Sequence, residues 1–262
     1  MPRPWTEKQK RFFRRELVEL YIKKNLSIRE IGKLLGLAES GVYDRLLRLD
    51  IKPIPSQKKG FLNKRAISFP KYSEDLAEIV GILLGDGHIS SGQIWFTLGS
   101  KEQEYSNYIN LLFSKVFGYQ LKISITNKGY TNLFIGFIAL VKYFKKMGLV
   151  QNKVKYQVGV PSWILKNKKY YSPCLRGLFD TDGSVYKIRS GYQISFKNMS
   201  FVLLKDIRKM LLVLGFSASQ ISNFSVYITK KEDLRRFREV IGSNNPPKFS
   251  RLVTWTNIKV VP

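Results

Sequence analysis

The sequence predicts an α+β protein in which an αββαββα unit occurs twice, preceded by a small all-helical domain. Two observations lead to this prediction. Runs with an apolar period of two, such as 93–98 and 121–126, are separated by amphipathic runs with a helical period. The body of the chain also repeats itself after roughly 95 residues, an interval too long for a solenoid unit.

The order of the motifs makes the repeat visible. The segment 81–87 (GILLGDG) returns as 177–183 (GLFDTDG), and 93–96 (QIWF) returns as 193–196 (QISF). Each half therefore reads as helix, two strands, helix, two strands, helix, which is typical of a fused dimer. A fused dimer suits a partner with its own approximate two-fold axis, such as duplex DNA. The expected later helices cover 105–116, 140–147, 201–213 and 234–241.

Shifts in composition predict four segments along the chain. Residues 1–50 form a helix-turn-helix domain, and 51–72 form a basic linker that contains Pro, Gly and Ser. Residues 73–160 form the first repeat, and 161–262 form the second.

The charge balance indicates the class of partner. The chain has 262 residues, with 45 Lys and Arg against 19 Asp and Glu, a formal net charge of +26. Hydrophobic residues make up 44%, enough for a core, which excludes a wholly disordered basic tail. This excess of positive charge on a folded chain favours nucleic acid as partner. A Lys-rich surface of a heat-adapted protein is the alternative, but it would carry matching acids.

Other functional classes are excluded by what the sequence lacks. No apolar run is long enough to span a membrane, and the N-terminus lacks the apolar region of a signal peptide. We therefore expect an intracellular protein, in the cytoplasm, nucleoid or an organelle, with no membrane partner. One cysteine, Cys174, excludes a disulfide framework and a zinc site built on several thiolates.

Residues 27–49 have the pattern of a helix-turn-helix. Ser27 and Glu30 form a capping box, 36–38 form a tight turn, and 39–49 form the second helix. The start of such a second helix reaches base edges, and later basic residues contact phosphates. The alternative is an αα-hairpin that only packs. The expected DNA contacts are Ser40, Tyr43, Arg45 and Arg48, and the expected apolar positions are Leu17, Leu20, Tyr21, Ile22, Ile28, Ile31, Leu34, Leu35, Val42, Leu46 and Leu49.

The repeated motif has small residues four positions apart, which lie on one face of a helix and let two helices approach closely. These residues are Gly81 and Gly85 in the first half and Gly177 and Thr181 in the second. Large apolar residues beside this face are expected in the core. The glycines that follow, Gly87 and Gly183, are expected in the left-handed conformation that ends a helix.

Asp86 and Asp182 are expected at the last turn of the two helices, so their carboxylates would meet at one end of the pair. Helix C-termini carry partial negative charge, and the two acids repel each other. A divalent cation resolves this conflict, and an all-oxygen ligand set suits Mg²⁺. In a basic protein this arrangement favours phosphodiester hydrolysis. A single Asp-Gly pair would be interpreted as an ordinary helix C-terminus. Two such pairs at equivalent positions of a repeat favour a functional site.

The segments 79–87 (IVGILLGDG) and 175–183 (LRGLFDTDG) resemble the two signature motifs of the LAGLIDADG homing endonucleases, in the single-chain, two-motif form. The resemblance covers residues 73–262 and includes 160–164 (VPSWI), which is similar to the segment that joins the family's halves. The first motif departs from the namesake at Leu84, where the namesake has an acid. The acid before the final glycine is present in both halves.

The resemblance implies a saddle of two four-stranded antiparallel sheets in the major groove, with Asp86 and Asp182 facing the minor groove. It implies Mg²⁺-dependent cleavage of one phosphodiester per strand, with Mn²⁺ as a substitute, leaving 3′ overhangs. Backbone oxygens at Gly85 and Thr181 would complete the metal's ligands. The expected base-reading positions are Gln93, Trp95, Thr97, Lys122, Ser124, Thr126, Lys187, Arg189, Gln193, Ser195 and Lys197.

Basic residues near the acids are further candidates. Lys153, five residues after Gly148, and Lys248, six after Gly242, occupy equivalent places in the two halves. They are expected to stabilise the charged transition state or to orient water. Chance alignment among 45 basic residues is the alternative. Ser100 and Lys101 are weaker candidates at the site, with Lys101 also expected to contact DNA, and His88 is expected to face DNA rather than to act as a base.

Three functions remain open at this level. The first is a Mg²⁺-dependent homing endonuclease that acts as a monomer on double-stranded DNA in intron homing. The second is a transcriptional regulator that kept the fold and lost cleavage, which the helix-turn-helix favours and the two acids oppose. The third is a maturase that binds intron RNA. Because the chain begins with Met and ends in KVVP without splice-junction residues, we expect a free-standing or intron-encoded protein rather than an intein.

Overall fold

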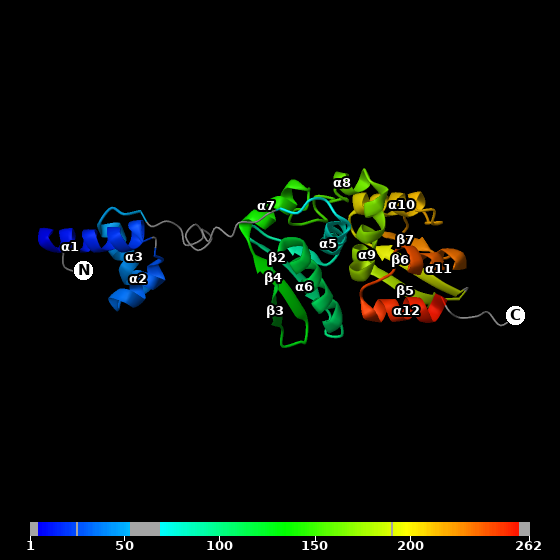
Figure 1. The fold of residues 1–262 in the computed structure, drawn as a ribbon, viewed down its shortest axis with the longest axis horizontal. Coiled ribbons are helices and arrows are strands. Elements are labelled where there is room, and N and C mark those ends of the chain that lie inside the picture. Colours follow the sequence, from blue (N-terminus) through cyan, green and yellow to red (C-terminus); the bar gives the residue numbers. More distant parts are fainter. Residues whose placement is uncertain (1–4, 25, 53–68, 190, 257–262) are drawn as a thin grey trace. The chain divides into compact units, whose positions relative to one another are not determined.

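The structure is a computed structural model that describes residues 5–24, 26–52, 69–189 and 191–256. The chain divides into two compact units, Met1–Ala66 and Ile67–Pro262, which are treated separately (Figure 1). The expected linker over 51–72 lies mostly outside the described residues. In the described parts, no helix combines the length and the apolar character that crossing a membrane requires.

The first unit is all-helical, as predicted. It consists of α1 (Glu7–Leu17), which continues as a π-helical segment (Val18–Lys23), then α2 (Ile28–Leu35) and α3 (Glu39–Arg48). The predicted capping box is present: the Glu30 amide donates to Ser27 Oγ (3.2 Å), and the Ser27 amide donates to Glu30 Oε2 (2.7 Å). Gly36 ends α2 with φ of 64°, the left-handed conformation that this tight turn requires.

The core of the first unit contains most of the expected apolar residues. Leu17, Tyr21, Ile31, Val42, Leu46 and Leu49 are buried. Two expectations were wrong, because the side chains of Ile22 and Leu34 are 56% and 64% exposed. The π-helical segment adds a residue to the turn, which rotates Ile22 away from the core. Leu34 lies on the flank of α2 beside the buried Ile31, where it remains open to solvent.

The second unit contains two similar halves: the first has the predicted αββαββα order, and in the described residues the second lacks one of the predicted strands. The first half is α5 (Glu74–Leu84), β1 (Gly87–Ile89), β2 (Gln93–Leu98), α6 (Gln103–Phe117), β3 (Lys122–Ile125), β4 (Thr131–Gly136) and α7 (Ile138–Lys146). The second half is α9 (Tyr171–Asp182), β5 (Gly183–Ile188), β6 (Gly191–Lys197), α10 (Phe201–Val213), β7 (Ser225–Ile228), α11 (Lys231–Val240) and α12 (Pro246–Thr256). The short helices α8 (Ser162–Leu165) and η2 (Lys168–Tyr170) lie between the halves.

Two antiparallel sheets form, but they differ in size. The first has four strands in the order β1-β2-β4-β3, and the second has three in the order β5-β6-β7. The expectation of a fourth strand in the second sheet was wrong. Beside β7, the Ser219 amide donates to the Tyr227 carbonyl (2.9 Å), but the Tyr227 amide donates to Ser219 Oγ (3.0 Å). A side-chain hydroxyl thus replaces the backbone carbonyl that a strand ladder would use.

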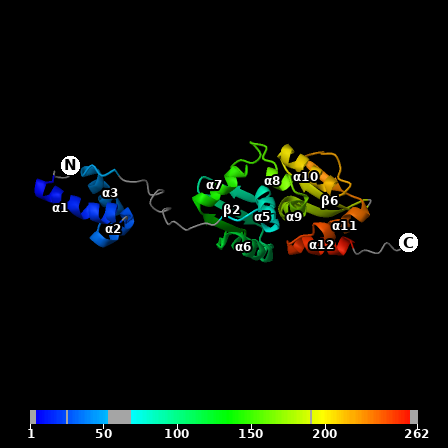
Figure 2. The same ribbon diagram turned by 45° about the horizontal axis from the view of Figure 1, so that its top comes forward.

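Helices α5 and α9 lie side by side between the two halves (Figures 1 and 2). The predicted small-residue face is confirmed. A Cβ atom at Gly81 would overlap the carbonyl oxygen of Cys174, and one at Gly177 would overlap the carbonyl oxygen of Glu78. Each glycine therefore accepts the backbone of the opposite helix, and this contact joins the halves.

The glycines after the acids act differently from the expectation. Gly183 has φ of −77° and ψ of 154°, an extended conformation that begins β5. A Cβ at Gly87 would lie 2.5 Å from Leu83 Cα, and one at Gly183 would lie 2.6 Å from the Phe179 carbonyl oxygen. Glycine is needed there because the chain folds directly back over the last helical turn, not because of a left-handed φ.

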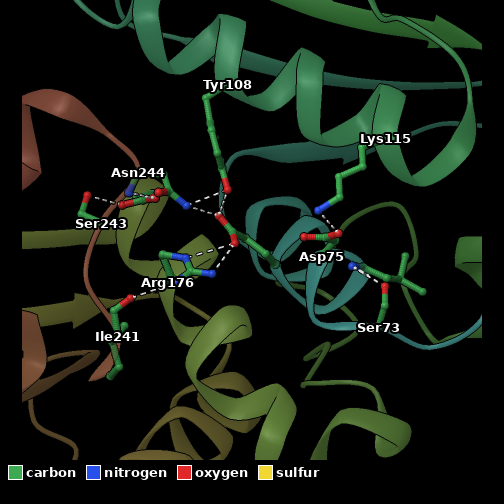
Figure 3. Close-up of polar contacts among 11 residues, drawn as sticks. Ser73, Asp75, Tyr108, Lys115, Arg176, Ile241, Ser243 and Asn244 are labelled. Carbon is green, nitrogen blue, oxygen red and sulfur yellow. Dashed lines mark hydrogen bonds and ion pairs between the residues drawn. The ribbon is translucent and has the colours of Figure 1, made fainter. Parts of the chain in front are cut away.

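A buried polar network joins the halves beside the helix pair (Figure 3). Glu78 of α5 is only 2% exposed. Arg176 of α9 donates to Glu78 Oε2 from Nε and Nη2 (3.0 and 2.7 Å). Tyr108 of α6 and Asn244 donate to Glu78 Oε1 (2.6 and 2.7 Å). Because the charge of Glu78 is fully paired, its burial is tolerated.

The loop after α11 extends this network to a second acid. The Asn244 amide donates to Asp180 Oδ2 (2.9 Å), and the hydroxyl of Ser243 donates to Asp180 Oδ1. Asn245 Nδ2 donates to Glu102 Oε1 in the first half (2.7 Å). Burial raises the pKa of Asp180 to about 7, against the lowering effect of these hydrogen bonds. The sequence analysis did not predict this network.

We predict that Gly81→Ala destabilises the second unit by about 2 to 3 kcal/mol, because the new methyl group forces α5 away from α9. Urea unfolding followed by circular dichroism measures this. Gly92→Ala is the matched control, since nothing lies within 4 Å of a Cβ at Gly92. Equal stability of the two variants would contradict the close helix contact.

Candidate active site at the ends of the paired helices

The two acids of the repeated motif lie together at one end of the helix pair. Asp182 is the last residue of α9, as expected, whereas α5 ends at Leu84, so Asp86 lies beyond the helix and not in its last turn. The cause is Gly85, whose φ of −77° and ψ of −102° take the chain out of the helix. A Cβ at Gly85 would lie 3.4 Å from the Asp182 carboxyl carbon, which shows how close the two chain segments are.

The environment disfavours the ionised form of both acids. Desolvation by the surrounding protein, helped by the Asp182 carboxylate, raises the pKa of Asp86 to about 6, although its side chain is open to solvent on one side. Desolvation also raises the pKa of Asp182, against a hydrogen bond from Asn198 Nδ2 to Asp182 Oδ2 (2.7 Å). The Asp182 charge acts on Asp86, so the two carboxylates form a pair that a cation would stabilise.

Lys153 and Lys248 are brought to this site from the equivalent places that the sequence predicted. Lys153 Nζ donates to the carbonyls of Leu83 (2.9 Å) and Leu84 (2.8 Å), and also to that of Gly85. Lys248 Nζ donates to the carbonyls of Phe179 (2.9 Å) and Thr181 (2.7 Å). Each ammonium therefore satisfies the free carbonyls at one helix end.

Burial lowers the pKa of both lysines. Desolvation brings the pKa of Lys153 down to about 8, although Asp182 and Asp86 act to raise it. The pKa of Lys248 is lowered by the same cause, with Asp180 as the strongest opposing charge. The two half-sites thus each contain an acid and a half-buried lysine.

The expected metal ligands divide into two groups. The carboxylates of Asp86 and Asp182 are hard oxygen donors of the kind that Mg²⁺ and Ca²⁺ prefer. The carbonyl oxygens of Gly85 and Thr181 instead accept the lysine ammonium groups. Within the described ranges, no group of three or more His, Cys, Asp or Glu could hold a metal ion. A cation here would therefore need water or phosphate oxygens besides the two carboxylates.

A cavity of about 480 Å³ opens beside the first half-site. Lys153, His88 and Gln151 are among its lining residues. The His88 ring stacks on Trp95, with centroids 4.1 Å apart. Desolvation, then the charge of Lys153, lowers the pKa of His88.

On the first sheet, the expected base-reading residues point away from the core. Gln93 and Thr97 are exposed and Trp95 is half-buried, while Ile94 and Phe96 between them are buried. On the edge strand β3, Lys122 and Ser124 are exposed, as are Thr126 and Lys101 in the turns. The sequence analysis missed Asn132, which accepts a hydrogen bond from Thr97 Oγ1 (2.8 Å), and Phe134. The alternation of buried residues along β4 was the signal that could have found them.

On the second sheet, Lys187 and Ser195 are placed differently from the expectation. Lys187 is exposed near the end of β5. Lys187 shares a face with the buried Val185, because side chains two apart along a strand point the same way. Ser184 and Tyr186 occupy the outward positions instead. Ser195 lies on the outward face, but it is only 7% exposed between Ser184 and Tyr227.

The other predicted residues of this sheet are accessible. Lys197 is exposed and Gln193 is half-buried, with Gln193 Oε1 accepting a hydrogen bond from the Tyr186 hydroxyl (2.7 Å). Arg189 is exposed in the turn after β5.

In the first unit, Ser40 and Tyr43 are exposed near the start of α3, where base contacts were expected. The two arginines are arranged differently from the expectation. The Arg45 guanidinium lies 4.6 Å from the Phe13 ring centroid, and that of Arg48 lies 5.3 Å from the Trp5 ring. These cation–π contacts direct both arginine side chains toward Trp5 and Phe13, near the start of the unit.

Comparisons with known proteins agree with this architecture. Residues 169–242 match the family model described as a LAGLIDADG-like domain. The fold is similar to that of I-DmoI in complex with DNA and Ca, with a TM-score of 0.51 and 16% identity over 69% of this chain and 97% of that chain.

Two curated proteins are also similar in sequence. Glutamine–fructose-6-phosphate aminotransferase of Methanocaldococcus jannaschii is 26% identical over 73% of this chain and 18% of its own length. The probable cell division protein WhiA of a Thermoanaerobacter species is 23% identical over 73% of this chain and 64% of its own length. The chain thus spans less than two thirds of either relative.

The raised pKa of Asp86 predicts a gain in stability when its charge is removed. Between pH 4 and 6 the folded state binds more protons than the unfolded state, so stability falls as pH rises through this window. Asp86→Asn should therefore be more stable than the parent protein at pH 7, by on the order of 1 kcal/mol after allowance for its solvent-exposed side. Urea unfolding at pH 4 and pH 7 in metal-free buffer measures the difference.

Asp75→Asn serves as the control for that measurement. Asp75 lies in the first turn of α5 and pairs with Lys115 (2.6 Å), so its loss should slightly lower stability. An Asp86→Asn protein less stable than the parent at pH 7 would show that attraction to the lysines outweighs desolvation and repulsion.

Proposed function

We propose that this chain is a site-specific endonuclease that cuts both strands of DNA. Its residues 169–242 match a LAGLIDADG-like domain, and its fold is similar to that of I-DmoI. One observation carries the proposal: two pseudo-equivalent helices bring Asp86 and Asp182 together, and at each helix end a half-buried lysine donates to the free carbonyls beside the acid. A site with one acid and one lysine per half suits a reaction performed once on each strand.

The chain's own residues have distinct roles in this proposal. Asp86 and Asp182 would hold a divalent cation, Mg²⁺ with Mn²⁺ as a substitute, and I-DmoI in complex with DNA and Ca supports the use of such ions. The bound cation would activate water and neutralise charge on the phosphate. Lys153 and Lys248 fix the two helix ends and place positive charge next to the acids, where negative charge develops during cleavage.

The surface supports DNA as the substrate. A net charge of +26 attracts a polyanion, and the outward faces of both sheets carry amide, hydroxyl and basic side chains. Because one chain contains both half-sites, we expect it to act as a monomer on a double-stranded target.

A DNA-binding regulator without cleavage is the second candidate. Two observations favour it: the similarity to a WhiA protein, and the accessible Ser40 and Tyr43 on a helix-turn-helix unit. The retention of both acids favours the nuclease. Binding of intron RNA stays a prediction that no observation here favours over DNA.

We predict that Asp86→Asn or Asp182→Asn lowers double-strand cleavage at least 100-fold while DNA binding stays within about threefold, because the cation ligands are lost but the sheets are unchanged. The assay is digestion of a randomised duplex library with Mg²⁺ or Mn²⁺, followed by sequencing of the ends. Asp75→Asn, which changes an acid in the first turn of α5 at the end opposite the site, should cut as the parent does. Variants that still cut both strands at the parental rate would exclude the two-acid mechanism, and a parent that binds selected duplexes without cutting would favour the regulator.

We also predict that removal of residues 1–50 weakens DNA affinity and flattens its salt dependence. Each lost phosphate contact lowers the slope of log affinity against log salt by about 0.9. The second unit has its own core, so it should remain folded in this test. Binding titrations between roughly 50 and 200 mM salt measure the slope, and an unchanged slope would make the first unit a module without phosphate contacts.

A further inference from the structure

One row of side chains on the first sheet differs from the rest of its outward face. The strand register pairs His88 with Trp95, Trp95 with Phe134, and Phe134 with Lys122. These four side chains therefore cross all four strands in one line, which we call the aromatic row. The His88 and Trp95 rings stack with centroids 4.1 Å apart, so the row presents three rings and ends in a cation.

The aromatic row faces away from the protein core. Trp95 lies between the buried Ile94 and Phe96, and Phe134 lies between the buried Leu133 and Ile135. Alternation along a strand places both rings on the opposite face, where they are half-buried. Large aromatic side chains on a face that is open to solvent are typical of a binding surface.

The corresponding row in the second half has a different chemistry. Gly87 pairs with Phe96 in the first sheet, and Gly183 pairs with Phe196 in the second, so the two registers correspond. The row that matches the aromatic row is therefore Ser184, Ser195 and Tyr227, which offers hydroxyl groups. The same fold forms here with serines in place of His88 and Trp95, so the fold does not require these two rings and a ligand is the better explanation.

Major-groove chemistry identifies what such a row would contact. Base edges in this groove are polar except at one place, the C5-methyl group of thymine. We propose that the aromatic row selects thymine by its methyl group in the half-site that the first half covers, an inference that rests on the proposed DNA-binding function. Lys122, at the end of the row, is suited to the neighbouring phosphate.

The position of the row places this contact near the cut. His88 follows Asp86 by two residues, about 7 Å along an extended strand. That length equals about two base-pair steps. The selected thymine therefore lies within the first few base pairs outside the cleavage position, in one half-site only.

The test begins with selection of duplexes from a randomised library by binding of the full chain, with no requirement for cleavage. We expect thymine to be enriched close to the centre on one side of the selected site. Each enriched thymine is then replaced by deoxyuracil, which lacks only the methyl group. Affinity should fall about fourfold for each methyl lost, the factor typical of burying one such group. Thymine replacement in the other half-site is the matched control and should change nothing.

Variants of the aromatic row test whether these side chains cause the preference for thymine. Trp95→Ser gives the first half the residue that the second half has at Ser195, and it should bind the thymine and deoxyuracil duplexes equally. Phe134→Tyr, which copies Tyr227, should reduce the difference without removing it. If Trp95→Ser fails to fold, as checked by circular dichroism, the Phe134→Tyr variant and the parent protein decide the question.

The possible outcomes distinguish the inference about thymine recognition from the proposed nuclease activity. Cleavage with no thymine preference, or a thymine preference that Trp95→Ser retains, overturns the role of the row and leaves the nuclease standing. A methyl-dependent preference without any cleavage supports the row and rejects the nuclease. Enrichment of no duplex at all rejects both.

Discussion

The contact between α5 and α9 is the constraint on which the rest of the second unit depends. Gly81 and Gly177 accept the opposite helix's backbone carbonyls, so the helices lie closer than any side chain would allow. This proximity brings two acids together from residues 96 positions apart, counted from Asp86 to Asp182. Two neighbouring carboxylates repel each other. The fold tolerates this repulsion because the close backbone contact between α5 and α9 fixes the position of both chain segments. The charge conflict at the site is thus a direct result of how the two halves are joined.

The buried network around Glu78 gives the helix contact its orientation. An apolar interface of two similar halves could slide by one helical turn, whereas a charge that needs Arg176, Tyr108 and Asn244 at once has one arrangement. The network is also asymmetric, since the first motif has Leu84 where the second has the buried Asp180. Because both halves belong to one chain, their sequences need not be identical, as they are in a symmetric dimer. Each half can therefore carry residues that fit its own part of the ligand.

Local spacing predicted much of this architecture. The small-residue faces, the two acids, the equivalent lysines and the outward residues of β2 all follow from patterns within a few residues. The network around Glu78 could not be predicted, because its partners lie 98 and 166 residues away in sequence. The face of Lys187 differs from the expectation, because alternation along β5 puts it on the same face as the buried Val185. In the described residues the second sheet has no fourth strand, and the Tyr227 amide bonds to the Ser219 hydroxyl instead of a strand carbonyl, a local exchange that composition does not predict.

The two half-buried lysines of the site also make folding of the helix pair independent of metal binding. In many small metal sites, the protein folds only when the ion arrives, so binding energy and folding energy are the same quantity. Here the ammonium groups of Lys153 and Lys248 already satisfy the carbonyls at the helix ends. The helix pair is therefore complete on its own, and a metal ion would find a preformed carboxylate pair rather than create one. Under the proposed function, DNA binding would then need no metal ion, and only cleavage would depend on it.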